Sequence, residues 1–64
     1  MEKHQLEQVI KRALVETYDE WKNGGREAWI VLDRISEKYE DEQYFDDIDG
    51  EALLEEVRKE MESL

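Results

Sequence analysis

The sequence predicts an all-α fold, a small three-helix bundle with an acidic loop between the second and third helices. Apolar residues recur at spacings of three and four, no proline interrupts the chain, and only one short run could form a strand. Sixty-four residues are enough for one domain at most. We therefore expect a single helical domain over residues 1–64, with helices at about 3–23, 26–40 and 50–63.

The first helix is predicted by an apolar face that extends to Trp21. Its residues are Leu6, Val9, Ile10, Ala13, Leu14, Thr17 and Trp21. Glu7 precedes Lys11 by four residues, the order that favours an ion pair on a helix. The helix should end before Gly24, because glycine readily adopts the left-handed conformation that closes many helices.

The second helix is predicted for a segment that contains the continuous apolar run AWIVL, residues 28–32. Such a run can also form a buried strand, but the chain holds no second strand-like run to pair with it. The helical spacing continues downstream and favours a helix, with a core face of Ala28, Val31, Leu32, Ile35 and Tyr39. At 100° per residue, this helix would point Ile30 away from the core and place Trp29 on its flank.

The third helix is expected to begin just after Asp49. As the N-cap, Asp49 would accept a hydrogen bond from a free backbone N–H group, and Ile48 and Leu53 would pack together as a hydrophobic staple. The apolar face of this helix consists of Leu53, Leu54, Val57, Met61 and Leu64.

The same stretch also matches part of a calcium loop. Asp47, Asp49, Gly50 and Glu56 fit four positions of the EF-hand pattern. The first ligand position, however, falls on Phe45, whose side chain offers no oxygen. We therefore favour the helix start and expect no metal site.

Charge is the most informative feature of the composition. The chain has 19 acidic and 9 basic residues, a net charge of −10. Residues 40–51, hereafter the acidic segment, hold seven acids and no base, whereas residues 25–39 hold three of each. Nucleic acids and anionic membranes would be repelled, since binding to phosphates depends on Lys and Arg. A partner of this chain should therefore present a basic surface.

No motif predicts an enzyme or a cofactor. His4 is the single histidine, there is no cysteine, and Gly24-Gly25 lacks the spacing and the Lys-Ser or Lys-Thr of a phosphate loop. Catalysis by paired carboxylates needs an enclosing pocket, for which a bundle of this size has little room. We expect a non-enzymatic protein without cofactors.

Two features bear on the cellular location. The opening residues MEKHQLEQ lack the apolar core of a signal peptide, and no apolar run approaches the length of a membrane span. The absence of cysteine is compatible with a reducing compartment. The expected location is therefore the cytoplasm, without membrane contact.

Two groups of residues are candidates for partner binding. The first lies in the acidic segment and consists of Glu40, Asp41, Glu42, Tyr44, Asp46 and Asp47. The second is the pair Trp29 and Ile30, since large side chains turned away from a core often anchor interfaces. Phe45 is expected instead to fold back over the open end of the bundle.

These features predict a small acidic interaction module that inhibits or regulates a larger protein by binding its basic, nucleic-acid-binding surface. In size and charge, though in no motif, the chain resembles small acidic inhibitors of DNA-binding proteins, many of them phage-encoded. The six residues DGEALL resemble a helix opening of sterile alpha motif domains, which have more helices than this chain can hold. The alternative is a self-associating regulatory or structural module, a homodimer paired through Trp29 and Ile30.

Overall fold

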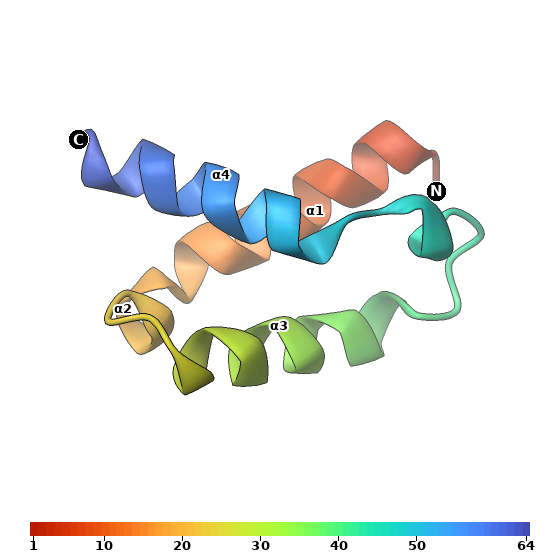
Figure 1. Cartoon of the computed structure of the whole chain (residues 1–64). Helices are drawn as coiled ribbons and strands as arrows, with labels where there is room; N and C mark the ends of the chain where they lie inside the picture. Colours follow the sequence, from red (N-terminus) through yellow and green to blue (C-terminus); the bar gives the residue numbers. More distant parts are fainter.

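Four α-helices and one 3-10 helix make up the fold in the computed structural model, which describes all 64 residues. They are α1 (Lys3–Glu16), α2 (Tyr18–Trp21), α3 (Arg26–Tyr39), the 3-10 helix η1 (Phe45–Asp47) and α4 (Gly50–Glu62) (Figure 1). The predicted all-α class is confirmed, and the AWIVL run lies within α3. None of the helices combines the length and the apolar composition needed to cross a membrane.

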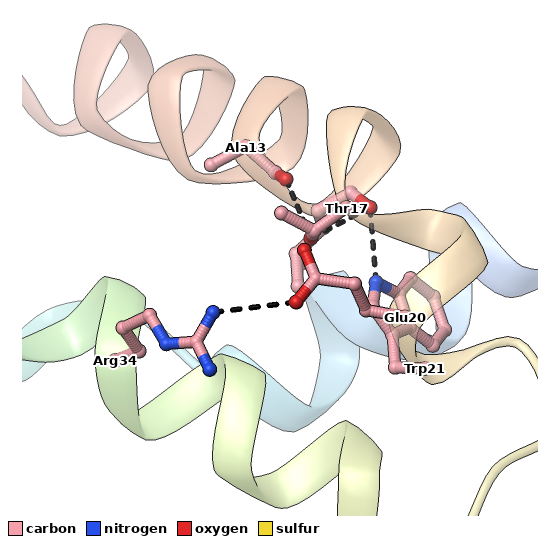
Figure 2. A network of polar contacts seen from close by, with 6 residues as sticks. Ala13, Thr17, Glu20, Trp21 and Arg34 are labelled. Carbon is pink, nitrogen blue, oxygen red and sulfur yellow. Dashed lines mark hydrogen bonds and ion pairs between the residues drawn. The ribbon is translucent and has the colours of Figure 1, made fainter.

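The first helix is not continuous over residues 3–23, as the sequence predicted, because it breaks at Thr17. The Thr17 hydroxyl donates to the Ala13 carbonyl at 2.8 Å, and the indole Nε1–H of Trp21 donates to the Leu14 carbonyl at 3.0 Å (Figure 2). A threonine hydroxyl that bonds four residues back bends a helix. The Trp21 indole thus satisfies the Leu14 carbonyl at the end of α1, whereas the Ala13 carbonyl also accepts from the Thr17 backbone N–H at 3.1 Å. The short α2 then turns Trp21 into the core.

The core is an apolar cluster to which all four α-helices contribute. Its eleven buried residues are Leu6, Ile10, Leu14, Trp21, Ala28, Val31, Leu32, Ile35, Leu53, Leu54 and Val57. No polar or charged residue is buried. All eleven were assigned to the interior by the helical spacing. Leu64 is a wrong prediction: it was placed on the apolar face of the last helix, but it is 94% exposed and lies beyond the end of α4.

Helices α1 and α4 are joined by an ion-pair bridge. Lys11 Nζ lies 3.7 Å from a Glu56 carboxylate oxygen and 3.6 Å from one of Glu60. Glu7, the partner expected from the spacing along α1, makes no ion pair with Lys11, which extends across to the neighbouring helix instead. This bridge links the two helices at the surface, beside the apolar core that they share.

The turn between α2 and α3 depends on two adjacent glycines. Gly24 has φ of 76° and Gly25 has φ of 66°, both in the region that other L-residues rarely adopt. The Gly24 N–H donates to the Trp21 carbonyl at 2.9 Å, which closes the end of α2. Gly25 then occupies the N-cap position of α3.

The acidic segment lies between α3 and α4, where the sequence predicted a loop, and part of it forms the 3-10 helix η1. Turns follow the end of α3, and η1 continues the chain toward α4 beside the N-terminus (Figure 1). The side chains of Phe45 and Ile48 are half-buried against the core cluster, as expected for Phe45. Two apolar anchors therefore attach a strongly acidic stretch to the bundle.

The N-cap predicted for the last helix is confirmed. An Asp49 carboxylate oxygen accepts from the Ala52 N–H at 3.2 Å, and α4 begins at Gly50. Ile48, just before the cap, packs against the cluster that contains Leu53. The carboxylate provides a partner for one of the free N–H groups in the first turn.

Replacing Asp49 with alanine is expected to lower the free energy of unfolding by about 1 kcal/mol, because the N-cap bond is lost. For a domain of this size, that loss lowers Tm by roughly 4 to 8 °C. Thermal unfolding followed by circular dichroism measures the change. The matched control is Asp47→Ala, which removes an exposed carboxylate of η1 that caps no α-helix. Equal Tm values for the two variants would contradict the assigned cap.

Candidate functional site

The carboxylates of the acidic segment have almost no partners within the chain. Of its seven acids, six are exposed and Glu42 is half-buried. Glu42 lies 3.5 Å from the N-terminal amine of Met1, and Asp49 caps α4. The remaining five make neither an ion pair nor a side-chain hydrogen bond; they are Glu40, Asp41, Asp46, Asp47 and Glu51.

Four of the nine bases pair with acids outside the acidic segment. Lys11 bridges to α4, and Lys22, Arg34 and Arg58 pair with Asp19, Glu20 and Glu55, respectively. The Arg34–Glu20 pair, at 3.3 Å, joins α3 to α2 (Figure 2). No lysine or arginine lies within ion-pair distance of the acidic segment, and the N-terminal amine beside Glu42 is the single cation that pairs with it.

The structure brings the first group of predicted site residues together on one ordered stretch. Glu40 forms the C-cap of α3, Asp41 and Glu42 lie in the turns that follow, and Asp46 and Asp47 belong to η1. Tyr44, at the N-cap of η1, is 36% exposed. An aromatic side chain therefore stands at the surface among these carboxylates.

The second group lies on the solvent-facing side of α3. Trp29 is 48% exposed and Ile30 is 47% exposed, in agreement with the directions expected from the helical period. Eleven positions separate Trp29 from Glu40, about 16 Å along the helix axis at 1.5 Å per residue. The two groups of candidate residues therefore lie toward opposite ends of one helix.

Two acids between these groups were missed by the sequence reasoning. Asp33 and Glu37 are exposed and have no ion-pair partner. Asp33 follows Trp29 by four residues, Glu37 follows Asp33 by four, and Glu40 follows Glu37 by three. This spacing places all four side chains on one face of α3. The spacing itself was a usable signal, but counting charges over residues 25–39 gave a balanced total and concealed it.

A shallow groove between α1 and α4 is a second surface feature. It is lined by Gln8, Val9, Lys11, Arg12, Val15 and Glu60. Because Lys11 is held by Glu56 and Glu60, the charges in this groove are largely balanced. Nothing in it selects one kind of ligand over another.

The residues of the calcium-loop interpretation have other contacts. Asp49 bonds the Ala52 N–H, and Glu56 pairs with Lys11 from the middle of α4. Phe45, at the first loop position, packs against the core. No group of three or more His, Cys, Asp or Glu side chains has an arrangement suited to a metal ion.

Comparison with known proteins does not place the chain in a family. No protein-family model, no curated protein and no solved structure matches it. The candidate function must therefore be argued from the surface alone.

Proposed function

We propose that this protein is an interaction module that binds a basic surface of a larger protein through its acidic segment. The observation that carries the proposal is the set of exposed carboxylates on this segment without a cation nearby. An ordered array of unpaired like charges contributes little to folding stability, because exposed charges interact weakly and here repel one another. A cationic partner would relieve that repulsion.

The basic surface that fits such a module is one that otherwise holds nucleic acid. Surfaces that bind nucleic acid carry clustered Lys and Arg, which neutralise phosphates. Carboxylates on an ordered segment can occupy the same positions, and the module would then inhibit or regulate the larger protein. Electrostatic steering would speed the encounter, and this effect weakens as salt rises.

Self-association is the second candidate function, and one observation favours it. Trp29 and Ile30 are adjacent large apolar side chains, each nearly half exposed on α3. Aromatic and aliphatic side chains of this kind form the centres of protein interfaces. The net charge of −10 works against pairing of two identical copies, so we rank this function second.

Neutralising four carboxylates of the acidic segment is expected to slow association with the partner by about tenfold or more at low salt. The variant changes Glu40 and Glu42 to glutamine and Asp41 and Asp46 to asparagine, which moves the net charge from −10 to −6. Partners are captured from lysate, and their association rates with both forms are measured at about 0.1 M and 1 M salt, where the Debye length is about 10 Å and 3 Å.

The matched control removes four acids outside the segment, so that its net charge is also −6. These acids have no ion-pair partner; they are Glu7, Glu16, Glu27 and Glu62, each changed to glutamine. The control should associate nearly as fast as the original protein. If both variants slow association equally, bulk charge and not the segment is responsible. An unchanged rate and salt dependence in the segment variant would refute the proposal.

A further inference from the structure

One face of α3 connects the exposed apolar pair to the acidic segment. Trp29 and Ile30 begin it, Asp33 and Glu37 follow at intervals of one helical turn, and Glu40 ends it where the acidic segment starts. We call these five residues the α3 ridge. All five are exposed; the bases at helical spacing from them are Arg26, at the start of the helix, and Arg34, whose charge is paired with Glu20.

We infer that the α3 ridge is a docking surface for a cationic amphipathic helix of the partner. The inference rests on the proposed function. It extends that function because it adds an apolar anchor and a defined spacing of carboxylates to a contact that otherwise depends on charge alone. Apolar side chains of the partner helix would cover Trp29 and Ile30. Its Lys or Arg side chains would lie along the three carboxylates.

Charge on the ridge selects this occupant. Asp33, Glu37 and Glu40 occur at spacings of four and three, so each carboxylate has a like-charged neighbour. Such neighbours destabilise a helix, by about as much as oppositely charged pairs stabilise it. None of the three has an ion pair within the chain. A row of bases placed opposite them would remove this repulsion.

A second copy of the chain fits the ridge less well than a basic partner. The ridge and Arg26 together carry three acids and one base, a local charge of −2. Two copies paired through this face would place a local charge of −2 on each side of the interface. Like charges across an interface disfavour association, so the apolar pair alone would have to overcome the repulsion.

The form of the partner follows from the all-helical fold. An extended peptide gains most of its affinity by adding a strand to a sheet edge, and this protein has no strand. A helix placed along α3 has the same rise of about 1.5 Å per residue. Bases four, eight and eleven residues from its apolar anchor would therefore align with Asp33, Glu37 and Glu40.

The test uses two synthetic alanine-based helical peptides of equal composition. In the matched peptide, lysines occupy the positions four, eight and eleven residues from a leucine pair; in the scrambled peptide, the same residues are spread around the helix. Isothermal titration measures the affinity of the whole protein for each. The matched peptide should bind about tenfold more tightly, the change expected when one interface anchor is satisfied.

Variants of the protein show which of its side chains contact the matched peptide. The double variant Trp29→Ala and Ile30→Ala should bind both peptides equally, with a salt dependence like that of the original protein. Alanine favours the helix, so circular dichroism should show that α3 persists. The variant Asp33→Asn and Glu37→Gln should also lose the preference. The control Val15→Ala and Leu64→Ala, which trims exposed apolar side chains elsewhere, should keep it.

The outcomes separate this inference from the proposed function. A variant with Asp41→Asn, Glu42→Gln and Asp46→Asn neutralises the segment but keeps Glu40 and the rest of the ridge. Equal binding of both peptides, reduced only by this variant, overturns the ridge and leaves the proposed function standing. A peptide preference that survives in this variant, with an unchanged salt dependence, supports the ridge and removes the role of the segment. Dimerisation seen by sedimentation, and abolished by Trp29→Ala and Ile30→Ala, overturns the inference in favour of self-association.

Discussion

Replacing Trp21 with alanine is expected to destabilise the domain strongly. Trp21 is fully buried, and removal of so large a buried side chain typically costs about 3 to 5 kcal/mol. The whole domain has roughly 3 to 10 kcal/mol of stability, at about 0.05 to 0.15 kcal/mol per residue. The substitution therefore removes a large share of the free energy that keeps the chain folded.

Several contacts converge on this indole. Its Nε1–H donates to the Leu14 carbonyl, the Tyr18 ring meets it edge-on with centroids 5.0 Å apart, and the Arg58 guanidinium lies 5.7 Å from its centre. It thus joins α1, α2 and α4. Such aromatic and cation–π contacts add about 0.5 to 1.5 kcal/mol each beyond the area that the ring buries.

Two further variants make this expectation specific. Trp21→Phe keeps most of the apolar volume but removes the N–H donor, so it should cost about 1 to 3 kcal/mol and leave a folded protein with a lower Tm. Trp29→Ala, at the half-exposed tryptophan, should change stability by only about 0.5 kcal/mol. Urea unfolding measures all three. Similar losses for Trp21→Ala and Trp29→Ala would contradict the assigned core.

Replacing Gly25 with alanine is expected to cost about 1 to 3 kcal/mol through backbone strain alone. Gly25 has φ of 66° and ψ of −136°, a conformation open to glycine and strained for L-residues. A β-carbon at this position would meet no atom within 4 Å, so crowding cannot account for a loss. Thermal unfolding measures the effect, a drop in Tm of roughly 4 to 8 °C for each kcal/mol.

A mirror-image residue provides the control for Gly25. Its backbone angles, with both signs reversed, are close to the polyproline conformation, which L-residues adopt easily. D-alanine introduced by chemical synthesis should therefore fit without strain and stabilise the turn slightly, because it restricts the unfolded chain. Equal destabilisation by L- and D-alanine would show that the loss arises from something other than backbone conformation.

The helices and the core were predictable because they depend on local spacing. The Asp49 cap, the left-handed Gly24 and the burial of Trp21 all follow from residues within a turn or two. The break at Thr17 was not predictable in this way. In a continuous helix, Trp21 would also face the core. The break depends on the hydrogen bond from its indole to the Leu14 carbonyl, which is in place once the core has formed.

Long-range contacts explain the other differences. Lys11 had a suitable acid four residues earlier, yet it pairs with two glutamates that only the packing of α4 brings near. The sequence predicted that Phe45 folds back over the bundle and that Ile48 packs with Leu53, but it did not predict the 3-10 helix η1 that carries Phe45. Such contacts depend on how distant segments meet, which spacing along the chain does not specify.

The candidate surface was predictable in part. The helical period gave the exposed directions of Trp29 and Ile30, and the composition gave the density of acids in residues 40–51. Asp33 and Glu37 were overlooked because the net charge of residues 25–39 is zero. Their importance appears only when the direction of each side chain around the helix is considered together with its charge.

The packing of α1 against α4 has a consequence for how the protein acquires its structure during synthesis. Lys11 and Glu56 are 45 positions apart, so the contact between these helices closes a loop that spans most of the chain. Closing it costs about 3.4 kcal/mol of chain entropy, apart from a constant. Since α4 supplies three of the core residues, a nascent chain cannot complete its interior before that helix leaves the ribosome. Folding therefore waits for the synthesis of α4, and until then the apolar face of α1 lacks part of its cover.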